Sequence, residues 1–128
     1  MTRPKPKDRR SRKYFQKMRK LLVVLELEGG FTVNKGLEDY QGDGFGVSFP
    51  GFESKIPLDL LNDDVFLSII QSYQNEQNGY HVTAWIEGTD VYFDITEIVE
   101  ERAVAKERAI KRERGAYYDY SHVKTIYV

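Results

Sequence analysis

Residues 80–95 read YHVTAWIEGTDVYFDI, two β-prone runs on either side of a short turn-forming segment. Residues 80–86 and 91–95 are rich in β-branched and aromatic side chains, which are enriched in strands. Between them, residues 87–90 include Gly88, and a glycine in so short a connection is typical of a tight hairpin turn. The stretch therefore predicts a β-hairpin, around which the rest of the chain is arranged.

Other segments predict further strands and two helices. Asn62 precedes two acids, which is a typical helix start, and an apolar face continues to about residue 79. Helical spacing resumes from about Glu97 and stops near Gly115. The remaining β-prone segments are residues 31–33, 44–49, 116–119 and 125–128. The pattern predicts an α+β fold: a small, mostly antiparallel sheet with two packed helices, preceded by a basic N-terminal arm or helix.

Positive charge is concentrated at the N-terminus. Residues 1–20 hold ten basic residues and one acid, a net charge of +9, whereas residues 21–128 hold the other nine basic and nineteen acidic residues, a net charge of −10. We expect a basic arm over residues 1–20, partly disordered or helical, and a single α+β domain over residues 21–128. Asp8 is a candidate cap for a helix through Lys20, and residues 21–28 fit either a continuation of that helix or a strand.

Composition excludes several classes of protein. Cysteine is absent, which removes disulfides, thiolate metal sites and cysteine nucleophiles and fits a reducing cytosol. No apolar run approaches the roughly 20 residues of a membrane helix. We therefore expect a cytoplasmic protein, in the host cell cytoplasm if a phage encodes it, without a membrane partner.

No residue pattern predicts a catalytic, metal or cofactor site. His81 and His122 lie far apart, so a metal centre would need both of them together with acids such as Asp94 or Asp119. Asp90 and Asp94 are expected to be turn and cap residues and not an acid–base pair. The glycine-rich segment 42–46 lacks the lysine and hydroxyl residue of a phosphate loop. We expect a protein that is not an enzyme and holds no cofactor.

The basic arm is the best candidate for a binding site, because dense lysines and arginines neutralise phosphates and release counterions. Tyr14 lies inside the run and is a candidate for stacking on an unpaired base. A solvated tail, or an arm that folds back on the acidic body, is the alternative. The candidate contact residues are Arg9, Arg10, Arg12, Lys13, Tyr14, Lys17, Arg19 and Lys20.

Three motifs of the C-terminal half form a recognisable pattern: Ala84-Trp85-Ile86, the run VYFDIT at residues 91–96, and Tyr118-Asp119. The pattern resembles that of uncharacterised small proteins of phages and mobile elements, over roughly residues 29–128. The resemblance implies a fold more than an activity. In organisation only, a basic arm on a small body is also similar to inhibitors of type II CRISPR nucleases, which implies a nucleoprotein partner.

The sequence thus predicts a non-enzymatic binding protein that contacts RNA, DNA or a nucleoprotein such as a CRISPR effector through its arm. Inhibition of host defence is one role that such a protein could have. A structural or assembly protein of a phage or mobile element, acting by protein–protein contact, is the alternative. A hydrolase or transferase built on His81 and His122 is a third hypothesis. Oligomeric state is left open.

Overall fold

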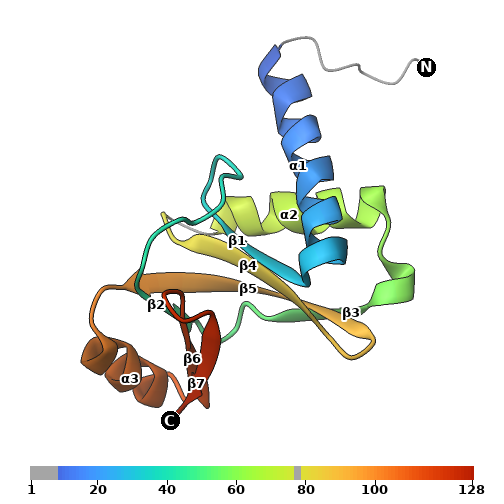
Figure 1. Cartoon of the computed structure of the whole chain (residues 1–128). Coiled ribbons are helices and arrows are strands. Elements are labelled where there is room, and N and C mark those ends of the chain that lie inside the picture. Colours follow the sequence, from blue (N-terminus) through green and yellow to red (C-terminus); the bar gives the residue numbers. More distant parts are fainter. Residues whose placement is uncertain (1–8, 77–78) are drawn as a thin grey trace, which may run out of the picture.

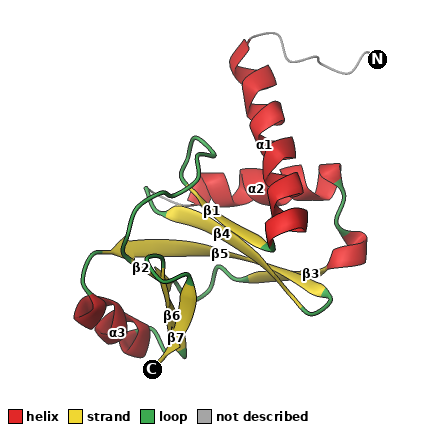
Figure 2. Cartoon of the chain, viewed as in Figure 1, coloured by secondary structure: helices red, strands yellow, loops and turns green. Residues whose placement is uncertain are grey.

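A computed structural model describes residues 9–76 and 79–128. Within these residues the chain forms three α-helices, a short 3-10 helix and seven strands that belong to one sheet (Figure 2). The α+β prediction is therefore confirmed, whereas the expectations for residues 1–8, including a cap at Asp8, lie outside the described residues. The elements are α1 (Arg9–Glu28), β1 (Gly30–Val33), β2 (Phe45–Ser48), β3 (Ser54–Pro57), the 3-10 helix (Leu58–Leu60), α2 (Asp63–Glu76), β4 (His81–Glu87), β5 (Asp90–Val99), α3 (Arg102–Lys111), β6 (Ala116–Asp119) and β7 (Lys124–Tyr127).

The predicted hairpin, β4 and β5, forms the centre of the sheet. Its register pairs Glu87 with Asp90, so that Gly88 and Thr89 make the turn. Gly88 has a φ of 63°, a left-handed conformation that glycine adopts without steric cost. The strand order is β1-β4-β5-β2-β6-β7, with β3 paired to the first half of β5, and every pairing is antiparallel.

β5 is longer than predicted, and two expectations are corrected by it. The helix expected from Glu97 does not begin there, because β2 pairs with residues 96–99 and extends the strand to Val99. Asp94, expected to be a cap residue, lies in the middle of this strand and is only 1% exposed. Both errors have the same cause: β2 and β5 pair although they lie about 50 residues apart, and a local sequence pattern contains no information about such a pairing.

One face of the sheet carries the hydrophobic core. Val82, Phe93 and Ile95 of the central strands are buried and belong to a cluster that also contains residues of α1 and α2. At the other end of the sheet, Val47 and Val99 pack with small side chains of α3. Figure 1 shows α1 and α2 at one end of the molecule and α3 at the other. Because side chains alternate along a strand, the opposite face is left for polar residues.

α1 joins the predicted arm to the domain. Met18, Leu21 and Leu25 are buried in the same cluster, so the helix continues through residues 21–28 and the boundary expected at residue 20 falls inside it. Gly29, with a φ of 84°, ends the helix. No helix among the described residues is long and apolar enough to cross a membrane.

Asn62 caps α2 as predicted, since its Oδ1 accepts a hydrogen bond of 2.9 Å from the backbone N–H of Val65. Asn62→Ala is expected to lower the free energy of unfolding by about 1 kcal/mol, because that N–H loses its partner. Urea unfolding followed by circular dichroism measures the change. Gln71→Ala, an exposed position in the same helix, is the control. Equal stability of Asn62→Ala and wild type would show that the cap does not contribute.

Candidate functional site

The N-terminal half of α1 presents a group of exposed cations. Figure 1 shows this half of the helix rising beyond α2 and away from the sheet. Arg9 and Arg10 form the first residues of the helix, and their side chains lie outside the described part of the structure. The exposed basic residues of the helix, called here the α1 cations, are Arg12, Lys13, Lys17, Arg19 and Lys20.

Within residues 9–76 and 79–128, none of the α1 cations forms an ion pair. The arginines of the body differ in this respect. Arg108 and Arg112 lie 2.5 and 2.6 Å from the carboxylate oxygens of Glu97, and Arg114 lies 2.8 Å from Glu53. Much of the positive charge of the body is therefore neutralised internally, whereas that of α1 is available to a partner.

The charges of α1 run against its macrodipole. The first turn contains no acid and the last turn no base, and Glu26 and Glu28 lie at the C-terminal end. Cations near a helix N-terminus are disfavoured by roughly 0.3–1 kcal/mol each at low ionic strength. The N-terminal half therefore combines side-chain and dipole fields of the same sign, which strengthens its attraction for anions.

Tyr14 and Lys17 differ from the other candidate residues. Tyr14 is half-buried and packs against the core cluster, with its ring 6.4 Å from that of Phe15, and burial raises the pKa of its hydroxyl. We therefore assign Tyr14 to packing. The Lys17 ammonium donates a hydrogen bond of 3.1 Å to the carbonyl of Gly36, which ties α1 to the loop after β1.

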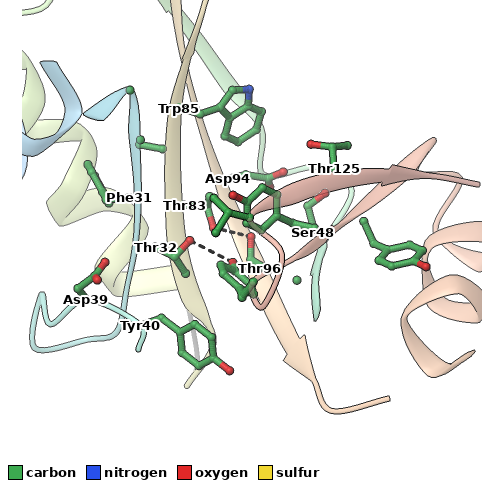
Figure 3. A pocket seen from close by; sticks show the side chains of 18 of the residues that line it. Phe31, Thr32, Asp39, Tyr40, Ser48, Thr83, Trp85, Asp94, Thr96 and Thr125 are labelled. Carbon is green, nitrogen blue, oxygen red and sulfur yellow. Dashed lines mark hydrogen bonds between the residues drawn. The ribbon is translucent and has the colours of Figure 1, made fainter. Parts of the chain in front are cut away.

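A cavity of about 800 Å³ lies on the polar face of the sheet. The sheet curls, so that strands from both ends of the strand order line this cavity. The hydroxyl of Thr32 on β1 is hydrogen-bonded, at 3.0 Å, to the hydroxyl of Tyr120, which follows β6. Thr83 and Thr96 form another, of 2.7 Å. Figure 3 shows these threonines together with Asp94 and Trp85 in the cavity wall.

Gly46 permits this closure. A methyl group at Gly46 would lie 2.9 Å from the Tyr120 ring and 2.9 Å from Thr96 Cγ2, so only glycine lets Tyr120 lie against the sheet here. Burial raises the pKa of Tyr120 to about 12, which keeps its hydroxyl protonated as a donor.

Asp94 is the buried acid of the cavity. Burial raises its pKa to about 6, although the hydrogen bond from the Ile95 N–H, the charge of Arg114 and the nearby Ser48 hydroxyl act in the opposite direction. Asp94 Oδ1 accepts the Ile95 N–H at 2.8 Å, while Oδ2 accepts no hydrogen bond within the described residues. Arg114 Nη2 lies 3.6 Å from Oδ2 and is hydrogen-bonded to Glu53 instead. A carboxylate that is costly to bury and incompletely paired is typical of a binding site.

The two histidines have separate roles. His81 on β4 packs its ring edge-on to Tyr40, and burial lowers its pKa. His122, in the turn after β6, donates a hydrogen bond of 2.8 Å from Nδ1 to the carboxylate of Asp119. Burial of Asp119 favours its neutral form, but hydrogen bonds from His122 outweigh this and hold the pKa of Asp119 below its usual value. No group of residues within the described ranges has the composition of a metal site.

Comparison with family models, curated proteins and solved structures found no match for this chain. The class of protein is therefore defined by its own features: an α+β protein with a cationic helix on one side and a curled sheet around an acidic cavity on the other. The residues of the helix were predicted from the sequence, whereas the cavity was not. The available signal was the run of polar residues at alternate positions, Thr83 on one strand and Asp94 and Thr96 on the next.

Proposed function

We propose that this protein binds nucleic acid through the α1 cations. The observation that carries the proposal is that these five side chains are exposed, belong to one helix and have no acidic partner among the described residues. Each such cation that meets a phosphate releases a condensed counterion, which favours binding.

The dimensions of the helix suit a phosphate backbone. An α-helix with its side chains is about 10–12 Å across, close to the roughly 12 Å width of the major groove of duplex DNA. The acidic body, with a net charge of −10 over residues 21–128, repels a duplex that lies across the sheet. The proposed complex therefore has the helix as its leading contact and the body held away from the nucleic acid.

Binding of wild-type protein to a short labelled DNA duplex and to single-stranded RNA, followed by fluorescence anisotropy, tests the proposal. With five phosphate contacts on the duplex, log affinity is expected to fall with log salt concentration at a slope of about −4 to −5 between ~50 mM and ~200 mM salt. Affinity that does not change with salt, or no binding of either probe at low salt, would contradict it.

The wider predictions remain proposals. If the protein comes from a phage or mobile element and inhibits host defence, its partner is a nucleoprotein such as a CRISPR effector, whose RNA meets α1 while the acidic body faces basic protein side chains. Cytoplasmic location and a non-enzymatic mode of action likewise stay predictions.

An assembly role is the second candidate function, and one observation favours it. Val23 and Leu27, four residues apart on α1, are 51% and 80% exposed. Exposed apolar side chains on one helix face are a common feature of protein–protein contacts. Size-exclusion chromatography with light scattering separates the two candidates, since the assembly role requires a stable oligomer without nucleic acid.

A further inference from the structure

We propose that the cavity of the curled sheet binds an organic cation, a primary ammonium or guanidinium group, through Asp94 and the aromatic side chains around it. Cation binding in this cavity is separate from nucleic-acid binding by α1 and does not depend on it. It assigns a role to the face of the sheet opposite the hydrophobic core, which the α1 cations do not use.

The charges of the cavity favour a cation. The acidic side chains that line it are Glu28, Asp39 and Asp94. No basic residue is part of the described lining, and the nearest cation to the Asp94 carboxylate is Arg114, 3.6 Å away. Burial raises the pKa of Asp39, and the neighbouring charge of Glu28 raises it further, so two carboxylates at the cavity repel each other. A bound cation relieves this repulsion.

Asp94 supplies the anchor. Its side chain is almost entirely buried, it lines the cavity, and its Oδ2 lacks a hydrogen-bond donor in the described structure. Arg114 forms an ion pair with Oδ2 at 3.6 Å but no hydrogen bond, because its Nη2 donates to Glu53 instead. An ammonium or guanidinium N–H that reaches Oδ2 makes a charge-assisted hydrogen bond, which is shorter and stronger than a neutral one.

The remaining wall suits the organic part of the ligand. Trp85, Tyr40 and Tyr118 present aromatic surface, which attracts cations electrostatically and packs against methylene groups. The Trp85 ring is held by parallel stacking on Tyr92, with ring centroids 5.3 Å apart. Thr83 and Thr96 bond each other and leave their remaining acceptor capacity at the cavity surface.

Trp85 is the only tryptophan of the chain, so its fluorescence reports on the cavity directly. We expect 1,4-diaminobutane to change Trp85 emission saturably, and 1,4-butanediol, which has the same length and no charge, to leave it unchanged. N-acetyl-arginine amide represents a protein side chain as the source of the cation. Saturable binding of either cationic probe supports the proposal and identifies the source; equal binding of the diol, or no binding of either cation, would overturn it.

Asp94→Asn is the diagnostic variant, since it removes the charge and keeps the shape. Loss of a charge-assisted hydrogen bond is expected to weaken binding of the cationic probe about tenfold to a hundredfold. Asp64→Asn, an exposed acid in the first turn of α2, is the matched control and should bind as wild type does. Unchanged affinity in Asp94→Asn would refute the assignment. Probe binding by a variant without α1 cations separates this result from the test of nucleic-acid binding.

Discussion

A variant in which Arg12, Lys13, Arg19 and Lys20 are replaced by glutamine is expected to bind duplex DNA roughly 4 × 10³-fold more weakly than wild type at ~0.1 M salt, because each lost phosphate contact costs roughly eightfold there. These four side chains are exposed and unpaired within the described structure. Glutamine retains helix propensity, and removing cations near the helix N-terminus relieves an unfavourable dipole interaction. The variant is therefore expected to fold, and anisotropy titrations measure its loss of affinity.

The chain offers a matched control for this variant. The body contains four other exposed lysines without an ion pair in the described residues, namely Lys35, Lys106, Lys111 and Lys124. Their replacement by glutamine changes the net charge by the same amount but leaves α1 intact. If both quadruple variants lose affinity equally, net charge and not the position of the cations governs binding, and the role assigned to α1 is wrong.

The second large expected effect is on the pH dependence of folding stability, through the carboxyl group of Asp94. Because the folded pKa of Asp94 is raised from 3.8 to about 6, the folded state binds this proton more tightly than the unfolded state does. Stability contributed by the protonated carboxyl is therefore present below about pH 4 and is lost as pH rises through about 6. Raising the pKa from 3.8 to about 6 corresponds to a loss of roughly 3 kcal/mol of folding stability at pH 8. Asp94→Asn, which cannot ionise, escapes this loss.

We expect the free energy of unfolding of Asp94→Asn, measured by urea denaturation, to exceed that of wild type by about 2–3 kcal/mol more at pH 8 than at pH 4. The comparison between the two proteins cancels the other titrating groups, among them His81, whose lowered pKa acts in the opposite direction. A constant difference between Asp94→Asn and wild type across this pH range would show that the carboxyl is not held in a costly environment.

Elements with local signals could be predicted from the sequence. The β4–β5 hairpin follows from β-prone runs around a glycine turn, and α2 follows from a capping side chain before two acids, now seen as the Asn62–Val65 hydrogen bond. Each of these signals acts between residues close in the sequence, so the surrounding fold has little influence on it.

Features that depend on distant pairing could not be predicted. β3 is short and mostly exposed, and it forms a strand because Ser54–Pro57 pairs with the first half of β5. The same strand continues to Val99 because β2 covers its other half. Asp94 lies near the point where β5 passes from one partner to the other, so its burial depends on three segments far apart in the sequence.

The basic composition of the candidate binding surface could be predicted from the sequence, but the contacts of its side chains could not. The density of lysine and arginine before residue 21 is plain in the sequence. Whether those cations are paired with acids, and whether Tyr14 faces a partner or the core, depends on how α1 packs. Among the described residues, the α1 cations form no ion pair, and Tyr14 packs against the hydrophobic core.

The most direct test of nucleic-acid binding by α1 is the salt dependence of duplex binding by the two quadruple variants. The slope of log affinity against log salt counts the phosphate contacts, at about 0.9 per contact. The variant with glutamine at Lys35, Lys106, Lys111 and Lys124 is expected to keep the wild-type slope of about −4 to −5. The variant of Arg12, Lys13, Arg19 and Lys20 is expected to have a slope of about −1. Equal slopes for the two variants would contradict the proposal that α1 makes the contact.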